Sequence, residues 1–141
     1  MKKILIVSDS ETLRLLYSLE LADEGYKVYT SKCEAGALDE ITRKKPHLIV
    51  VNLNPGKYEG PDFLLKLRRA CRNTPVIFCM PCPGFALHGK SSLNEDFIVI
   101  SSDVSELKQK VRRALETKSK SWQKAAPKNA REARYLILQT V

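Results

Sequence analysis

The sequence lacks long apolar runs and has little cysteine, and both features restrict the class of protein. No apolar stretch approaches the roughly 20 residues that a membrane-spanning helix requires. Met1 to Lys3 lead directly into the short apolar stretch Ile4 to Val7, without the cleavage pattern of a signal peptide. The four cysteines are too few and too scattered for a disulfide-stabilised scaffold. We therefore expect a cytoplasmic protein in a reducing compartment.

The positive charge of the chain is concentrated at its carboxyl-terminal end. At 141 residues the chain is long enough for one domain with a substantial core. Its formal net charge is +8, of which residues 117–141 carry +5, from six Lys or Arg and one Glu. A basic tail of this kind can bind nucleic acid or an anionic membrane through charge alone. A solvated tail that keeps a small protein in solution is more common, and we favour that interpretation.

The most informative stretch is Pro46 to Gly56, in which an apolar run reaches the amide of Asn52 and is followed by Pro55 and Gly56. A run that is rich in β-branched residues, without polar alternation, favours a strand covered on both faces in a parallel sheet. Asn52 then lies at the carboxyl end of that strand. In open α/β sheets this edge is where ligands bind, and here it carries an amide in place of an acid.

Strand-like and helix-like segments alternate along the body of the chain. Each strand-like run is short and apolar, and each helical segment has apolar residues at helical spacing, such as Ala35, Leu38 and Ile41. We expect strands at residues 4–7, 26–31, 46–52, 75–80 and 97–100, and helices at 11–24, 34–44, 61–71 and 104–115. Proline and glycine between the fourth and fifth strands predict an irregular segment there. This alternation predicts an α/β fold with a parallel sheet and right-handed crossovers.

The carboxyl-terminal residues divide into two parts. Residues 117–127 are polar and lysine-rich around Trp122, which is typical of a linker. Residues 128–141 fit either a helix that begins after Pro127 or a strand from Tyr135 to Val141, and we favour the helix. The apolar run ends abruptly at Val141. We therefore expect either a fragment of a longer protein or a tail that docks on the body or on a partner.

Several segments carry a resemblance to a known family. The first strand ends in Val7-Ser8-Asp9-Ser10, the third is Pro46 to Asn52, and the fourth is Thr74 to Phe78. Gly60 follows the third strand, and Asp96 to Val99 leads into the fifth. With the fivefold repeat, these segments resemble the receiver domain of two-component response regulators over about residues 2–116. The resemblance implies a receiver-like domain over residues 1–116 with a flavodoxin-like, doubly wound five-stranded parallel sheet, strand order 2-1-3-4-5.

The resemblance also implies a chemistry. Receivers of this family accept a phosphoryl group from a histidine kinase on an aspartate at the end of the third strand. That aspartate and two acids after the first strand hold Mg²⁺, while a Thr or Ser and a Lys bind the phosphoryl oxygens. The attacking group must be a carboxylate oxygen, and the charge that gathers on the phosphoryl oxygens must be neutralised.

The matching positions of this sequence depart from that pattern. Asn52 stands at the acceptor position, and Ser8 and Asp9 stand at the acid pair. Met80 stands at the hydroxyl position and Ile100 at the lysine position. Of the five charged or hydroxyl groups, only Asp9 remains. We therefore expect no catalytic residue, weak or absent Mg²⁺ binding and no other cofactor.

These departures predict a pseudo-receiver, which signals through protein contacts without taking up a phosphoryl group and is not an enzyme. Phe97 matches the aromatic residue of the family's conformational switch, but Met80 cannot be drawn in by a phosphate. The switch is then either frozen in one state or set by a partner. The resemblance implies a histidine kinase or another response regulator as the partner, and a homodimer through the fourth and fifth βα units.

Other candidate sites are weaker. Cys79 and Cys82 form a C-x-P-C pattern that is also found in thiol-redox sites, but Cys79 belongs to a strand and no helix start follows, so structural thiols are favoured. His88 adds a third potential zinc ligand to this pair, without a fourth nearby. His47 opens the third strand at the end opposite the pocket, where a surface residue is expected. The third helix carries a basic cluster that is most simply a solvated face: Lys66, Arg68, Arg69 and Arg72.

Overall fold

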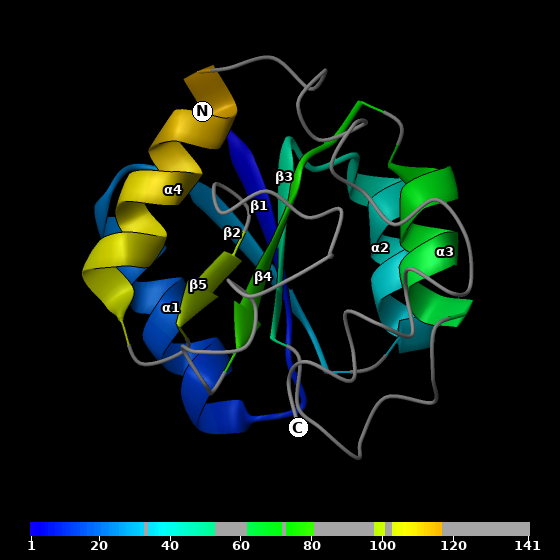
Figure 1. Cartoon of the computed structure of the whole chain (residues 1–141), viewed down its shortest axis with the longest axis horizontal. Helices are drawn as coiled ribbons and strands as arrows, with labels where there is room; N and C mark the ends of the chain where they lie inside the picture. The colour runs from blue at the N-terminus through cyan, green and yellow to red at the C-terminus, as the bar shows by residue number, and fades with distance from the viewer. Residues whose placement is uncertain (33, 53–61, 72, 81–97, 101–102, 117–141) are drawn as a thin grey trace, which may run out of the picture.

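A computed structural model describes residues 1–32, 34–52, 62–71, 73–80, 98–100 and 103–116 of the chain. Within these ranges the expected alternation of strands and helices is present (Figure 1). Several predictions lie outside the described residues: Phe97, the irregular segment before the fifth strand, the linker over 117–127 and the segment 128–141. None of the described helices is both long enough and apolar enough to cross a bilayer.

The centre of the fold is a parallel sheet whose strand order is β2-β1-β3-β4-β5. All neighbouring strands pair in parallel. The strands are β1 (Lys3–Val7), β2 (Lys27–Ser31), β3 (Leu48–Asn52), β4 (Val76–Met80) and β5 (Ile98–Ile100). This order confirms the prediction of a doubly wound, flavodoxin-like sheet, because the chain reverses its direction of travel across the sheet after β2.

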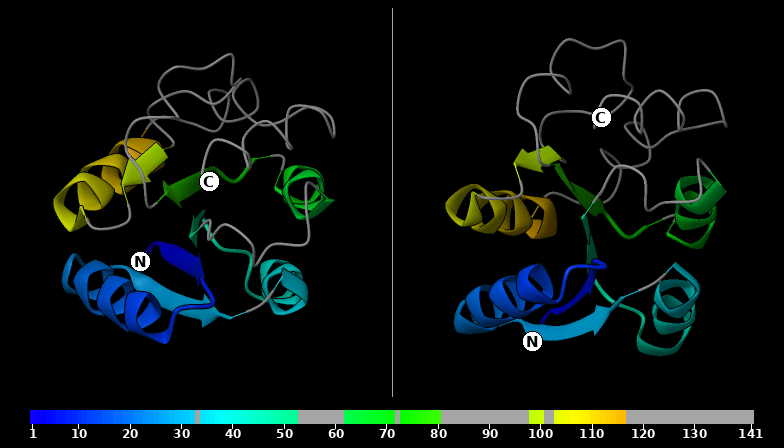
Figure 2. Two further views of the ribbon diagram at one scale, coloured as in Figure 1. Left: turned by 60° about the horizontal axis from the view of Figure 1, so that its bottom comes forward. Right: turned by 90° about the horizontal axis from the view of Figure 1, so that it is seen from below.

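Helices cover both faces of the sheet, as the right-handed crossovers of parallel strands require. The helices α1 (Glu11–Asp23) and α4 (Val104–Glu116) lie on one face, and α2 (Glu34–Lys44) and α3 (Asp62–Ala70) lie on the other (Figures 1 and 2). The strand β3 in the middle of the sheet is buried along its whole length. The unbroken apolar run of the sequence is therefore explained by a strand with helices on both sides.

Local signals set the ends of α1. The side chain of Ser10 caps the helix, because its hydroxyl oxygen accepts a hydrogen bond from the backbone N–H of Leu13 at 3.2 Å. Gly25, with a φ of +95°, follows the last turn in a backbone conformation that side chains disfavour. Tyr17 and Leu21 face the core. The helix between β1 and β2 therefore begins at a side-chain cap and ends at a glycine.

One detail of α2 differs from the prediction. Ile41 is buried and Leu38 is partly buried, as expected, but Ala35 is exposed and Ala37 is fully buried in its place. Ala37 and Ile41 are four residues apart and share one face of the helix, whereas Ala35 lies on another side. The spacing of three apolar residues was therefore correct for a helix but did not determine which side of it faces the sheet.

Candidate functional site

The strand ends that the sequence singled out meet at the carboxyl edge of the sheet, which lies at the bottom of the sheet in Figure 1. Val7 of β1 pairs with Val51 of β3, so that Ser8 and Asn52 follow on adjacent strands. Asn52 in turn pairs with Cys79 of β4. Parallel strands bring their carboxyl ends to one edge, and this edge is the candidate site.

Ser8 is completely buried at the end of β1. Its backbone N–H donates to the carbonyl oxygen of Ser31 at 3.0 Å, and its hydroxyl oxygen accepts from the backbone N–H of Ser10 at 3.1 Å. Its own carbonyl oxygen accepts a hydrogen bond of 2.6 Å from Nη1 of Arg14. Ser8 therefore connects β1 to β2 and to the first turn of α1, and it brings no charge to the site.

Asn52 and Asp9 differ in both burial and charge. Asn52 is only 5% exposed at the end of β3, and its side chain is a neutral amide. Asp9 carries a carboxylate but is exposed to solvent. The buried part of the edge is thus lined by neutral groups, and the one predicted carboxylate, that of Asp9, lies at its exposed rim.

Two further predicted positions are placed by the backbone alone. Met80 is the last residue of β4 and pairs with Ile100, the last residue of β5. Both positions therefore belong to the same edge as Asn52, although the described structure does not extend to their side chains. Phe97, Cys82 and His88 lie outside the described residues.

Sequence reasoning missed Arg14, whose guanidinium bonds the end of β1. The available signal was its position, since Arg14 follows the capping residue Ser10 by four residues and its backbone N–H donates to the carbonyl oxygen of Ser10 at 3.0 Å. A side chain one turn after the cap points back toward the start of its helix. Arg14 thus adds a positive charge beside the strand end at which the family resemblance implies a metal ion.

The residues at this edge do not fit Mg²⁺. The ion prefers octahedral oxygen ligands that include carboxylates, and it gives up its water reluctantly. Asp9 is the single carboxylate among the predicted positions, and the buried oxygen atoms beside it belong to a hydroxyl and an amide. Within the described ranges no cluster of three or more acidic, histidine or cysteine side chains is suited to a metal ion.

The cysteine of this edge is poorly suited to thiol chemistry. Cys79 is completely buried and carries a thiol that belongs to no disulfide. Burial raises the pKa of this thiol to about 12, although a hydrogen bond with Tyr17 of α1 acts in the opposite direction. Redox chemistry requires the thiolate and access to it, and neither is available at Cys79 near neutral pH.

The remaining candidates lie away from this edge. His47 is exposed at the amino end of β3, where its Nδ1 accepts a hydrogen bond of 3.0 Å from the backbone N–H of Lys3. Lys66 and Arg69 are exposed on α3 and Arg68 is half-buried, while Arg72 lies outside the described residues. The structure therefore does not bring His47 or the basic cluster to the site around Asn52.

The family model of the response regulator receiver domain matches residues 4–81. The chain is 32% identical over 78 residues to the transcriptional regulatory protein YxdJ of Bacillus subtilis, which covers 55% of this chain and 34% of that protein. The chain thus spans about a third of the length of that curated relative.

Solved structures agree with the fold. The chemotaxis response regulator CheY4 of Vibrio cholerae superimposes with a TM-score of 0.68 at 21% identity, covering 80% of this chain and 98% of CheY4. The response regulator TrrA of Thermotoga maritima, solved in complex with Mg²⁺ and BeF, gives a TM-score of 0.67 at 25% identity, with coverages of 80% and 98%. The described architecture is therefore that of complete, independently solved receiver domains.

Proposed function

Because the chain belongs to the family of response regulator receiver domains, we propose that it is a receiver-like signalling module that takes no phosphoryl group on β3 and acts through contacts with other proteins. The observation that carries this proposal is the buried amide of Asn52 at the end of β3. The fold supports a signalling role, and the residues of the carboxyl edge support a pocket without phosphoryl chemistry. In this proposal the module is not an enzyme and needs no cofactor.

The chemical reason lies in the acceptor group. Phosphoryl transfer to a side chain requires an oxygen with an available electron pair and a product that the site can hold. The side chain of Asn52 is a neutral amide, in which the nitrogen lone pair is delocalised toward the carbonyl oxygen. That oxygen carries only a partial negative charge and is a much weaker nucleophile than a carboxylate oxygen. Catalysis of phosphoryl transfer also depends on positioning and on positive charge that stabilises the transferring group. Because the residues of the carboxyl edge do not fit Mg²⁺, we do not expect them to provide this positive charge through a bound metal ion.

A receiver-like module that takes no phosphoryl group can still signal through contacts with other proteins. A histidine kinase or another response regulator is the partner class that the family suggests, and a homodimer through the last two βα units is part of the same proposal. Exposed polar and charged side chains line the outer side of α4, among them Ser105, Gln109 and Arg112. This surface is available for a protein partner whatever the state of the carboxyl edge.

The phosphorylation experiment uses acetyl phosphate with Mg²⁺ and intact-mass spectrometry of the full chain. We expect no phosphoryl adduct on the wild-type protein. The matched control restores the family's groups with the substitutions Ser8→Asp, Asn52→Asp, Met80→Thr and Ile100→Lys, and this variant should gain an adduct. An adduct on the wild-type chain that survives in an Asn52→Ala variant would locate phosphorylation elsewhere, and one that is lost in that variant would refute the proposal.

The homodimer is tested separately by sedimentation velocity over a range of protein concentrations. A dimer through α4 and β5 should weaken when Gln109 and Arg112, both exposed on α4, are replaced by Glu. The control replaces the exposed residues Lys66 and Arg69 of α3 by Glu and should leave association unchanged. A chain that stays monomeric at every concentration contradicts the dimer and leaves the phosphorylation result to be judged by itself.

A further inference from the structure

Positive charge gathers at the amino-terminal edge of the sheet, opposite the site around Asn52. This edge, which we name the lysine edge, consists of five side chains from the starts of β1 and β2 and the end of α2. They are Lys2, Lys3, Lys27, Lys44 and Lys45. The amino terminus lies at the same edge, where Met1 is 89% exposed. None of the proposed signalling chemistry uses this surface.

Hydrogen bonds hold the parts of the lysine edge together. Lys3 of β1 pairs with Lys27 of β2, and the backbone N–H of Lys27 donates to the carbonyl oxygen of Lys2 at 2.9 Å. Nζ of Lys3 donates to the carbonyl oxygen of Lys44 at 3.3 Å. The cations therefore come from separate parts of the sequence but form one continuous surface.

Two of these ammonium groups lie over the ring of Tyr29 of β2. Nζ of Lys44 is 5.1 Å from the centre of the Tyr29 ring, and Nζ of Lys27 is 5.7 Å from it. Contact with the negative face of an aromatic ring offsets part of the repulsion between like charges. The ring thus allows two lysines to stay close together without a carboxylate.

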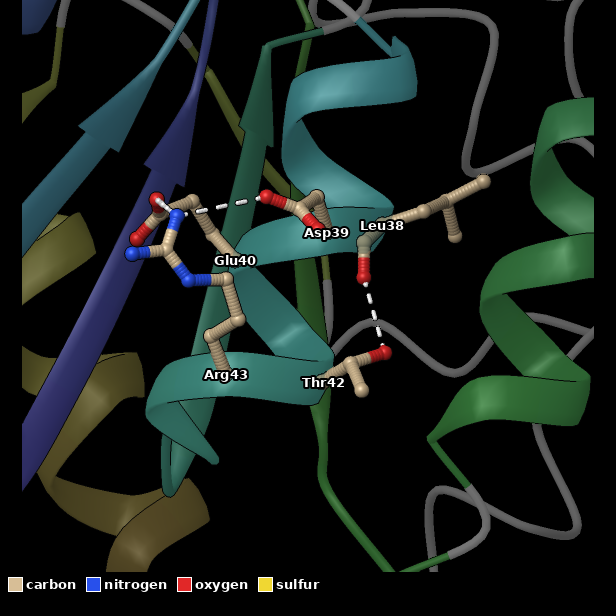
Figure 3. Close-up of polar contacts among 5 residues, drawn as sticks. All are labelled: Leu38, Asp39, Glu40, Thr42 and Arg43. Atoms are coloured by element: carbon tan, nitrogen blue, oxygen red, sulfur yellow. Dashed lines mark hydrogen bonds and ion pairs between the residues drawn. The ribbon is translucent and has the colours of Figure 1, made fainter.

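Nearby acids are engaged elsewhere. In α2, Nη1 of Arg43 lies 3.4 Å from Oδ2 of Asp39 and 3.8 Å from Oε1 of Glu40 (Figure 3). At the end of α1, Glu24 pairs with Lys108 and Arg112 of α4. Across the described ranges, none of the five lysines forms an ion pair with a carboxylate.

His47 reports on the same positive charge. Partial burial lowers the pKa of this exposed imidazole, and the charges of Lys2, Lys3 and the amino terminus lower it further. The neutral form is also the one observed in the hydrogen bonding, because Nδ1 accepts from the backbone N–H of Lys3. Two lysines of the lysine edge and the amino terminus therefore act together on one imidazole, as the members of a charge cluster do.

We propose that the lysine edge is a docking surface for an anionic lipid bilayer. Acidic lipid headgroups attract clusters of four to eight Lys or Arg. An exposed apolar side chain beside such a cluster can enter the interfacial region of the bilayer. Here five lysines share one edge of the sheet with the highly exposed Met1. Docking at this edge leaves the carboxyl edge free for a protein partner, because the carboxyl edge lies at the opposite end of the strands (Figure 1).

The composition of the edge favours lipid over nucleic acid. All five cations are lysines, which act as hydrated point charges, whereas recognition of discrete phosphates and base edges favours the planar fork of arginine. Tyr29 cannot serve as a stacking platform for bases, because two ammonium groups already lie over its ring. Binding to the acidic surface of a bilayer requires neither an arginine fork nor a free aromatic ring.

The test measures partition of the full chain into vesicles of phosphatidylglycerol and phosphatidylcholine, with vesicles of phosphatidylcholine alone as the reference. The variant K2Q/K27Q/K45Q removes three exposed cations of the edge. Its partition coefficient should fall roughly 100-fold, from the usual contribution of each lysine near an acidic surface. The matched control K32Q/K66Q/R69Q removes the same charge from exposed positions outside the edge and should change partition less than about threefold.

Two further arms make the result decisive. The variant K118Q/K120Q/K124Q tests the basic tail, and a fluorescent DNA duplex replaces the vesicles in an anisotropy titration. Equal losses in the edge variant and its matched control, loss only in the tail variant, or binding of the duplex without binding of acidic vesicles would each overturn the proposal. Thermal melting curves that match the wild-type curve establish that the surface variants are folded.

Discussion

At the scale of single residues, neutral and cationic side chains determine what each edge of the sheet can do. Ser8 and Asn52 bury polar groups without charge at the carboxyl edge. Burying a charge without a partner is costly, whereas a hydrogen-bonded hydroxyl or amide is tolerated in a folded interior. This neutral, buried strand end is the basis of our proposal that the site takes up neither a metal ion nor a phosphoryl group.

His47 should make stability depend on pH in the mildly acidic range. Its pKa is lowered in the folded state by partial burial, Lys2, Lys3 and the amino terminus, so the unfolded chain binds the proton more readily. The free energy of unfolding should therefore fall as pH drops through the ordinary pKa of 6.5 toward the folded value. Chemical denaturation across this pH range measures the free energy of unfolding, and an NMR titration of the His47 ring gives its pKa in the folded state.

The same titration offers a matched pair of variants. Replacing Lys2 by Gln removes one of the charges that act on His47 and should raise its pKa toward the ordinary value. Replacing Lys66 by Gln, an exposed position on α3, should leave it unchanged. An equal response to both substitutions would show that the lysine edge does not act on this histidine.

Cys79 should be unreactive in the folded protein. Its complete burial and its pKa of about 12 leave almost no accessible thiolate at neutral pH. Thiol counting with Ellman's reagent should give the same number for the native wild-type protein and a native Cys79→Ala variant. In denaturant the wild-type chain should show one more reactive thiol. A difference of one already in the native proteins would favour the thiol-redox alternative.

The raised pKa of the Cys79 thiol should also make the free energy of unfolding depend on pH in the alkaline range. The folded state favours the protonated thiol, so the stabilising contribution of Cys79 is present below the unfolded pKa of about 8.5. It is lost as pH rises from there toward the folded value of about 12. The wild-type protein should therefore lose stability in alkali more steeply than the Cys79→Ala variant.

At the scale of elements, each helix is held by one apolar face, and α1 gives the clearest case. Leu21 is completely buried against the sheet, whereas Leu19 on the same helix is 62% exposed. The two leucines have equal helix propensity and equal transfer free energy, so only their surroundings distinguish them. An ion pair also joins α1 to α4: Nζ of Lys108 lies 2.5 Å from Oε2 of Glu20.

Alanine substitutions on α1 should separate core packing from surface exposure. Leu21→Ala should lower the free energy of unfolding by about 2–5 kcal/mol, because it removes buried methyl groups and leaves a cavity. Leu19→Ala should change it by less than about 0.5 kcal/mol, as for exposed positions generally. Chemical denaturation of both variants measures the difference. Similar losses at the two positions would indicate that α1 packs with a different face inward.

At the scale of the whole molecule, the described core is self-contained. All of its buried apolar side chains lie between Ile4 and Ala114. The edge strand β2 contacts both α1 and α2, the edge strand β5 contacts α4, and the last strand of the described sheet ends at Ile100. This supports the proposed division into a receiver-like domain over residues 1–116, a linker over 117–127 and a terminal segment over 128–141.

A chain truncated after Glu116 should therefore keep its fold. We expect circular dichroism and a single cooperative unfolding transition like those of the full chain, because the truncation removes none of the described core. The control truncates after Asp103, which removes α4 with Leu107 and Val111, and should abolish cooperative unfolding. Loss of the transition on truncation after Glu116 would mean that the tail is part of the folded unit.

Much of the fold and of the candidate site could be predicted because the relevant signals are local. The β-branched run before Asn52 indicates a buried strand, and the geometry of a parallel sheet then brings Ser8, Asn52 and Met80 to one edge. Arg14 was not predicted, since its bond to Ser8 depends on how α1 leaves the strand. The inward side of α2 was predicted only in part, because several alanines fit the helical spacing.

The sequence by itself determined the order of strands and helices, the α/β class and the chemistry of the strand ends, because hydrophobic periodicity and residue type act over short distances along the chain. Only the tertiary structure decided that Nζ of Lys3 donates a hydrogen bond to the carbonyl oxygen of Lys44, 41 residues away. The same holds for the ammonium groups of Lys27 and Lys44, which lie over one tyrosine ring. The physical reason is that charge potential and burial depend on distance in space. Parallel crossovers bring together residues whose separation in sequence carries no signal of their contact.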